Sequence, residues 1–244
     1  HDEVAHWLIN RDILAGHHAI YFTEAYGHEA LYHYAQAGFG ALVGDHALGL
    51  RLPSAYFGVL LVAAGYALGR RLFGESVGWW SAAFLAVLFW PVFYSRLGLR
   101  AIALPVVSGL SAWAWWRAFA GGWALAGERG SGGAGAISRP STDSLPDPLP
   151  KGEGGPNPAP LHLGWVIASG ALAGLSLHTY MAGRAVPIFY ALYCAYLAVF
   201  HRAAFRRQWR GIVGFWLALA AVALPLVVFL LTNPGAEARI AEVD

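Results

Sequence analysis

The sequence is poor in charged residues, and its acids are absent from two long stretches. Charged residues make up 12% of the chain and hydrophobic residues 57%, whereas soluble domains carry about twice that charged fraction. No Asp or Glu lies between Glu75 and Glu128, or between Glu153 and Glu237. An ionised carboxylate at the bilayer centre costs about 3 kcal/mol on insertion scales, so acid-free stretches suit membrane-spanning helices. These absences exclude a soluble protein and predict an all-α, polytopic membrane protein.

Several other features are rare or missing. The single Cys194 excludes a disulfide framework. Lys151 is the only lysine, so any cation that binds phosphate elsewhere must be Arg or His. The net charge of +2 is too small to suggest a nucleic-acid partner, and no glycine-rich phosphate loop or nucleophile elbow is present. The chain begins at His1 without an initiator methionine and has no signal peptide, so we expect it to be a fragment.

Polar chemistry is concentrated near the start of the chain. Seven of the ten histidines and six of the fourteen acids lie at or before His46. Residues 1–16 are expected to form a short interfacial helix, with Gly16 at its end. Residues 17–27 are expected to form an aromatic loop. The apolar face of this helix is predicted to carry Val4, Trp7, Leu8 and Leu14. The polar face is predicted to carry Asn10, Arg11 and Asp12.

Six better candidates for membrane spans follow, each close to the ~20 residues that a hydrocarbon core of ~30 Å requires. Gly170 and Gly174 form a small-xxx-small pair that permits close helix contact. Residues 121–161, rich in Gly and then Pro, lack periodicity and are expected to form a dispensable disordered linker. The tail 232–244 would begin a second outer loop. The six predicted spans, which make up the region 52–231, are 52–69, 77–94, 101–116, 163–182, 185–200 and 211–231.

Loop charges predict the orientation. Ten cations follow the first, third and fifth spans, and the positive-inside rule makes that side cytoplasmic. If residues 28–43 crossed the membrane, the N-terminal segment would share the cytoplasmic side. Their two histidines and one glutamate favour an interfacial helix, which leaves residues 1–51 as an extracytoplasmic loop. The ten cations are Arg70, Arg71, Arg117, Arg129, Arg139, Lys151, Arg202, Arg206, Arg207 and Arg210.

Some polar groups at the predicted outer face are candidates for chemistry. Asp2 and Glu3 favour the dipole of a helix N-terminus, or else serve as a reacting carboxylate beside an anionic substrate. Arg96, Arg100 and Arg184 either extend to lipid headgroups or bind a lipid-linked phosphate, for which guanidinium geometry is suited.

The histidines give no familiar metal-binding pattern. His28-Glu29 followed by His33 is one residue longer than the zincin H-E-x-x-H pattern, and that spacing on a helix rotates the second histidine away from the first. The pairs His17-His18 and His1/His6 have no fixed metal-ligand spacing either. No metal or other cofactor is therefore expected.

Several strings resemble one family of membrane enzymes. They are Asp2-Glu3, Tyr26-Gly27-His28-Glu29-Ala30-Leu31-Tyr32, Leu50-Arg51-Leu52-Pro53-Ser54-Ala55, Gly69-Arg70-Arg71-Leu72-Phe73-Gly74, Ser95-Arg96-Leu97-Gly98-Leu99-Arg100, and Leu177-His178-Thr179-Tyr180 through Arg184. Their order resembles that of the bacterial GT-C membrane glycosyltransferases of glycosyltransferase family 39, which include protein O-mannosyltransferases and aminoarabinose lipid A transferases. The resemblance runs through most of the chain.

The resemblance implies a GT-C-type helical bundle in the bacterial inner membrane, with its active site on the extracytoplasmic side. It also implies transfer of a hexosyl or pentosyl group from a polyprenyl-phosphate donor to a protein, lipid or glycan acceptor. Asp2 would be the general base and Glu3 would orient the site. The residues expected to hold the donor phosphate are His28, Glu29, Arg96, Arg100, Tyr180 and Arg184.

Two alternatives remain at this point. A transporter would place ionisable groups within its spans, whereas here the polar groups gather at one face. An inactive membrane scaffold is the other alternative, because a fragment of the fold would lack half of its helices.

Overall fold

The computed structural model describes residues 2–23, 27–127 and 162–236. Nearly all of this part of the chain is helical, and a small hairpin joins the first two helices. The elements are α1 (Asp2–Leu14), β1 (Tyr21–Phe22), β2 (His28–Glu29), α2 (Ala30–Val43), α3 (Ala47–Phe73), α4 (Glu75–Val87), α5 (Phe89–Arg96), η2 (Arg100–Ile102), α6 (Ala103–Gly127), α7 (Leu163–Ser176), η3 (Met181–Arg184), α8 (Ala185–Phe200), α9 (Arg202–Thr232) and η4 (Pro234–Ala236).

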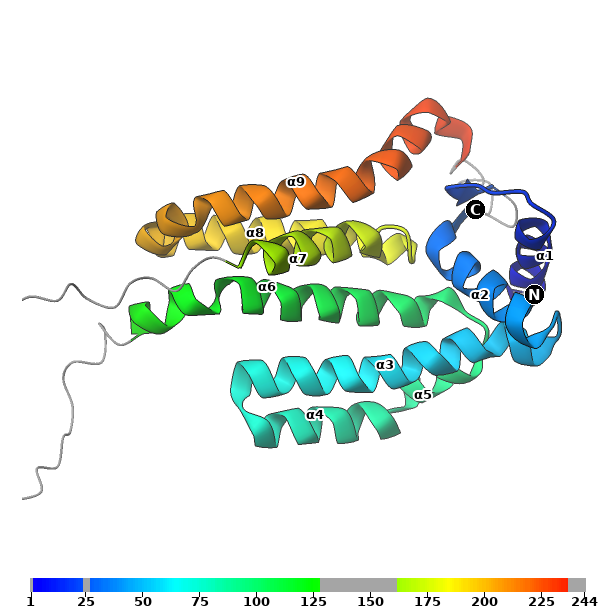
Figure 1. The fold of residues 1–244 in the computed structure, drawn as a ribbon, viewed down its shortest axis with the longest axis horizontal. Helices are drawn as coiled ribbons and strands as arrows, with labels where there is room; N and C mark the ends of the chain where they lie inside the picture. The colour runs from blue at the N-terminus through cyan, green and yellow to red at the C-terminus, as the bar shows by residue number, and fades with distance from the viewer. Residues whose placement is uncertain (1, 24–26, 128–161, 237–244) are drawn as a thin grey trace, which may run out of the picture.

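The long helices lie side by side and give the bundle two unlike ends (Figure 1). The α3–α4 turn, the last part of α6 and the α8–α9 turn lie together at what we call the basic end, which carries Arg70, Arg71 and Arg117. Helices α1 and α2 cover the opposite end, which we call the polar end. The loops that follow α5 and α7 also reach the polar end (Figure 1). The segregation of loop charges in the sequence therefore corresponds to two physical ends of the bundle.

Three helical stretches in the described residues are long and apolar enough to cross a membrane: α3, η3 continued by α8, and α9. A fourth candidate is α4 together with α5, which are bent by 54° at their junction. Helix α7 is apolar but has only 14 residues. Helix α6 lies where another span is expected and continues to Gly127, past the predicted start of the linker. The rest of that linker, 128–161, lies outside the described residues.

The bend between α4 and α5 was not expected, because residues 77–94 read as one continuous span. Leu88 has an extended backbone, with φ −61° and ψ 138°, and interrupts the helix. Pro91 follows three residues later and has no N–H to donate to the preceding turn. Proline is tolerated in the first turn of a helix, whereas in the interior it removes a hydrogen bond and kinks or breaks the helix. A new helix that begins at Phe89 satisfies this constraint.

Helices α7 and α9 are packed backbone to backbone. A Cβ on Gly170 would lie 2.3 Å from the carbonyl oxygen of Phe215, and a Cβ on Gly174 would lie 2.7 Å from that of Leu219. The predicted close contact at the small-xxx-small pair is confirmed. The hydroxyls of Ser111 and Ser169 each donate to the other residue's carbonyl at 2.9 Å and link α6 to α7.

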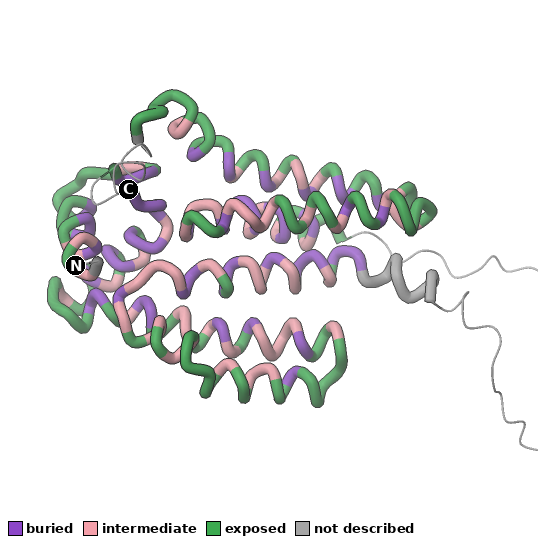
Figure 2. Tube along the Cα trace, turned by 180° about the vertical axis from the view of Figure 1, so that it is seen from behind, coloured by how far each residue is buried: buried purple, intermediate pink, exposed green. Residues whose placement is uncertain are grey.

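Many large apolar side chains face outward from the bundle. The outer surfaces of α8 and α9 include long exposed stretches (Figure 2), and Phe189 and Leu217 are among the exposed side chains. Trp79 and Trp80 are exposed on α4. Exposed apolar surface of this extent marks contact with lipid or with another protein. It agrees with a multi-pass membrane protein.

Helix α1 forms as predicted, but the face that packs against the rest of the protein is not the predicted apolar face. His6, Ile9, Asn10 and Ile13 are buried, at the spacing of one helical face. Val4, Leu8 and Leu14 are exposed instead. The prediction placed Asn10 on the solvent side because it is polar. In the structure this face meets α2, which itself presents polar side chains toward α1.

Helix α2 does not cross the bundle; it lies across its polar end (Figure 1). Its 14 residues are too few for a span. The hairpin that precedes it pairs Tyr21 with Glu29 and Phe22 with His28. Gly27 has a φ of +84°, and a Cβ there would lie 2.1 Å from the Tyr21 hydroxyl. Because Gly27 has no Cβ, the backbone can pass close to the Tyr21 hydroxyl just before β2 begins.

Candidate active site at the polar end of the bundle

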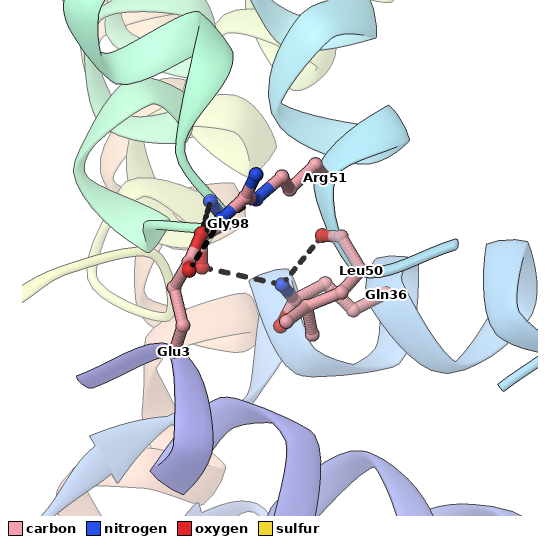
Figure 3. Close-up of polar contacts among 5 residues, drawn as sticks. All are labelled: Glu3, Gln36, Leu50, Arg51 and Gly98. Carbon is pink, nitrogen blue, oxygen red and sulfur yellow. Dashed lines mark hydrogen bonds and ion pairs between the residues drawn. The ribbon is translucent and has the colours of Figure 1, made fainter. Parts of the chain in front are cut away.

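Glu3 fastens the start of α1 to two other elements (Figure 3). Its carboxylate accepts two hydrogen bonds from the Arg51 guanidinium, at 2.9 and 2.8 Å, and one from the Gly98 N–H at 3.0 Å. The hydrogen bond from Arg51 is the largest cause of a lowered Glu3 pKa, and the Gly98 N–H lowers it further. Glu3 therefore stays ionised and holds the loop after α5 against α1.

Gln36 lies behind this clamp and is fully buried. Its amide nitrogen donates to the carbonyls of Leu50 at 3.0 Å and Gly98 at 3.3 Å (Figure 3). Tyr32, one turn earlier on α2, hydrogen-bonds through its hydroxyl to Ser54 of α3, and burial raises its pKa. Helix α2 therefore fixes the positions of α3 and of the loop that carries Gly98.

A second, more buried ion pair joins the hairpin to the start of α6. The Arg100 guanidinium donates to the Glu29 carboxylate at 2.8 Å, and the two side chains are only 17% and 4% exposed. The same guanidinium nitrogen reaches the Gly27 carbonyl at 3.3 Å. The Arg100 guanidinium carbon lies 5.4 Å from the centre of the Tyr180 ring, a cation–π distance. Three of the predicted donor-binding residues, Glu29, Arg100 and Tyr180, therefore come together.

The segment after α7 is anchored to both neighbours. The Leu31 N–H donates to the His178 carbonyl at 3.0 Å, which ties α2 to this turn. The His178 ring is 3.0 Å from the Val222 carbonyl of α9. A Cβ on Gly183 would lie 2.1 Å from the Ser176 carbonyl oxygen, so η3 folds back closely on the end of α7. Arg184 ends η3 and is partly buried.

Three buried histidines, His6, His28 and His33, contact one another at the polar end. His28 Nδ1 and His33 Nε2 are 3.1 Å apart. The His6 ring centre lies 5.2 Å from that of His28 and 4.6 Å from that of His33. Burial lowers the pKa of His33 well below its usual range, and the neighbouring His6 and His28 lower it further. His33 is therefore neutral near pH 7.

Spacing alone pointed away from this histidine cluster. The comparison with H-E-x-x-H placed His28 and His33 on one helix, where their side chains would diverge. In the structure His28 belongs to β2 and only His33 belongs to α2, so the helical spacing rule does not apply to the pair. His6 shares a face of α1 with Asn10, which the sequence prediction had assigned to the polar side.

A large apolar cleft opens between α3, α6, η3 and α8. Its volume is about 630 Å³. Its lining on α6 runs from Leu104 to Trp116, about 18 Å along the helix at 1.5 Å per residue. At the polar end the lining includes Ala182 and Ala185, which flank Arg184 within two residues. Leu104 lies one helical turn after Arg100. The cleft thus runs along α6 toward the basic end, and neither Arg100 nor Arg184 is among its lining residues.

The remaining predicted site residues are placed as follows. Asp2 begins α1 directly before Glu3, and its side chain lies outside the described part of the structure. Arg96 is exposed at the end of α5 and has no ion pair among the described residues. The ring of His28 is held in the histidine cluster. No role was predicted for Arg51, although it lies in one of the family strings. Its pairing with Glu3 could have been suspected, because the two residues carry opposite charges and both were predicted to lie at the outer membrane face.

The comparisons with known proteins bear on one stretch of the chain. Residues 28–128 match the family model described as dolichyl-phosphate-mannose-protein mannosyltransferase. No curated protein and no solved structure matches the chain. The matched stretch includes Glu29, Arg96 and Arg100 but not Asp2, Glu3 or the turn that carries Tyr180.

Proposed function

We propose that this chain, whose residues 28–128 belong to the GT-C membrane glycosyltransferases, transfers a sugar to an acceptor hydroxyl at the extracytoplasmic face of the membrane. The family match identifies a membrane glycosyltransferase that uses a polyprenyl-phosphate sugar donor. The acceptor would be a protein, lipid or glycan that reaches the polar end from outside. The reaction breaks the bond between the anomeric carbon and the phosphate oxygen and forms one to the acceptor oxygen.

The observation that carries this proposal is the course of the apolar cleft. A polyprenyl phosphate has a long apolar tail and a charged headgroup. The cleft offers an apolar wall of about 18 Å that includes Leu104 and Ala185, which follow Arg100 and Arg184 in the chain. Burial of apolar surface would hold the tail, and guanidinium groups suit the phosphate. Arg100 keeps donors to spare, because arginine has five N–H groups and one nitrogen serves both Glu29 and Gly27.

The chemical steps need a base for the acceptor and positive charge for the leaving phosphate. Asp2 is our candidate base, since its neighbour Glu3 is committed to Arg51 and Gly98. That clamp holds the first turn of α1 against Gly98, which lies two residues before Arg100 in the chain. A positioned base contributes about 10²–10⁴ in rate. Arg100 and Arg184 would stabilise the charge that develops on the departing phosphate.

The distribution of cations supports the proposed orientation. The basic end gathers the cations of the α3–α4 turn and the α8–α9 turn, and such loops stay in the cytoplasm. The polar end, with α1 and α2, then lies outside. Exposed Val4 and Leu8 on α1 suit a helix that rests on the outer leaflet.

The test is sugar transfer by the full-length protein in proteoliposomes, with radiolabelled polyprenyl-phosphate mannose as the first donor. We expect Asp2→Asn to lower kcat by at least about 100-fold while donor KM stays within threefold. Asp12→Asn is the matched control, an exposed acid on the same helix, and should behave as the parent. Equal kcat for Asp2→Asn and the parent would refute the assignment of Asp2. Absence of transfer with every polyprenyl-phosphate sugar tried would refute the proposed function.

A further inference from the structure

The cluster of His6, His28 and His33 brings together three elements of the polar end. His6 belongs to α1, His28 to β2 and His33 to α2. Their side chains are 2%, 6% and 0% exposed. One nitrogen from each ring lies within 4.8 Å of the nitrogens offered by the other two. No pair of these histidines has the sequence spacing of a familiar metal motif.

We propose that His6, His28 and His33 bind one transition-metal ion, Zn²⁺ being the best fit, which pins α1 to the hairpin and α2. Three imidazoles form a known zinc ligand set that leaves one coordination position for water or another oxygen ligand. The site takes no part in the sugar-transfer chemistry proposed above and does not depend on that assignment.

The distances support metal coordination. Two nitrogens bound at about 2.05 Å to a tetrahedral zinc ion are about 3.3 Å apart. His28 Nδ1 and His33 Nε2 are 3.1 Å apart and share a hydrogen bond, which coordination of both nitrogens would replace. No separation in the set exceeds 4.8 Å, so the contraction required is at most about 1.5 Å, which small rotations of the side chains supply. Zn²⁺ binds neutral imidazole, and each of the three rings can supply one such nitrogen.

Buried amides adjacent to two of the histidines provide an outer shell. Asn10 lies one helical turn after His6, and Gln36 one turn after His33. The Asn10 Oδ1 and Gln36 Oε1 atoms are buried and make no hydrogen bond of ordinary geometry within the described residues. Histidines that bind a metal almost always donate their other ring N–H to an oxygen acceptor, which fixes the ring orientation. These amide oxygens are suited to that role.

The position of the cluster defines what the metal would do. Glu3 lies one turn before His6 on α1, and Glu29 follows His28 directly. A metal bound by all three histidines would therefore fix the clamp of Glu3 relative to the Glu29–Arg100 pair. The full burial of His33 keeps substrate away from the ion. The role inferred is that of a structural pin for the site.

The direct test is metal binding by the full-length protein, purified in detergent through an affinity tag that contains no histidine. The protein is stripped with a chelator, checked for a single monodisperse species, and titrated with Zn²⁺ alone and with Co²⁺ alone. We expect one equivalent of Zn²⁺ by mass spectrometry of the metal. Cobalt should give the intense visible absorption of low-symmetry coordination, and Zn²⁺ should abolish it.

Four variants separate this site from adventitious binding. His6→Gln and His33→Gln should weaken Zn²⁺ binding by more than about 100-fold, and Gln36→Ala by about 10–100-fold, the range for loss of an outer-shell partner. His17→Gln changes an exposed histidine of the same segment and should bind as the parent. Failure of the stripped parent protein to take up one equivalent would overturn the proposal, whether or not the variants fold. So would retention of full affinity by His33→Gln.

Discussion

The buried ion pair between Glu29 and Arg100 yields the sharpest prediction about stability. The Glu29 carboxylate is 4% exposed and lies 2.8 Å from an Arg100 nitrogen. Replacing Arg100 with Gln leaves an ionised carboxylate in a buried position, whereas replacing Glu29 with Gln leaves a guanidinium that still has the Gly27 carbonyl and the Tyr180 ring. The two single substitutions should therefore differ in their effects.

The expected magnitudes follow from what each change leaves behind. Removing one partner of a buried ion pair costs about 3–5 kcal/mol, and Arg100→Gln should fall in this range, at about 4 kcal/mol. Glu29→Gln should cost about 2 kcal/mol, since Arg100 is 17% exposed and keeps two other contacts. The double variant should cost about 3 kcal/mol, because no unpaired charge remains. The coupling energy is then roughly 3 kcal/mol, at the upper end of values for residues in contact.

The assay is equilibrium unfolding of the full-length protein in mixed micelles, followed by tryptophan fluorescence as denaturing detergent is added. The parent, both single variants and the double variant complete a double-mutant cycle. Arg96→Gln is the matched control, since Arg96 is exposed and has no ion pair in the described part of the chain, and it should change stability by less than about 0.5 kcal/mol. Additive effects of the two single changes would refute the assignment of a coupled buried pair.

Two further predictions concern the clamp and the helix contact. The lowered pKa of Glu3 means that its ionised form stabilises the folded state at pH values above the ordinary pKa near 4.5. This stability is lost as pH falls through the lowered pKa. Glu3→Gln should therefore remove that part of the acid transition in unfolding curves, and an unchanged curve would contradict the clamp. Gly170→Ala should destabilise the fold by about 1–3 kcal/mol because its Cβ meets the Phe215 carbonyl oxygen at 2.3 Å. Gly164→Ala, on the same helix with no neighbour within 4 Å, should be neutral or slightly stabilising; equal effects of the two changes would refute the close contact.

The bundle was largely predictable because lipid imposes simple rules on sequence. Acid-free apolar stretches, loop cations and the Gly170–Gly174 pair gave the class of the fold, the two ends and one helix contact. The same rules gave no warning of the break at Leu88. Hydropathy sums the residues on both sides of the break. Pro91 alone does not mark it either, since α3 and α9 continue through Pro53 and Pro225.

The polar end was less predictable because buried polar groups there satisfy one another across elements. The prediction placed Asn10 in solvent on polarity alone, whereas the structure buries it on the face that also carries His6. The spacing of His28 and His33 was judged as helical, although the hairpin ends between them. No period in a single segment encodes such contacts. The charge pairs were partly foreseeable, since Glu3 and Glu29 had to find cations at the same membrane face.

The cleft could not be predicted from the sequence because its walls come from α3, α6, η3 and α8. Each of these segments reads only as apolar, and each has other outward-facing positions of equal hydropathy. Their relative rotation decides which side chains line a groove and which contact lipid. That rotation depends on the packing of all the helices together.

The central claim, that the cleft holds a polyprenyl-phosphate donor, is tested most directly by photolabelling. A polyprenyl phosphate with a diazirine in its tail is added to the full-length protein in proteoliposomes, and the labelled residues are mapped by mass spectrometry. We expect adducts on cleft residues such as Ser108 and Tyr190, and competition by unlabelled polyprenyl phosphate but not by the uncharged prenol. The adducts should be lost in Ala112→Trp, a substitution within the cleft, but not in Ala83→Trp, an exposed position on α4. Labelling that is spread over the lipid-facing surface, or that is unchanged by Ala112→Trp, would contradict the claim.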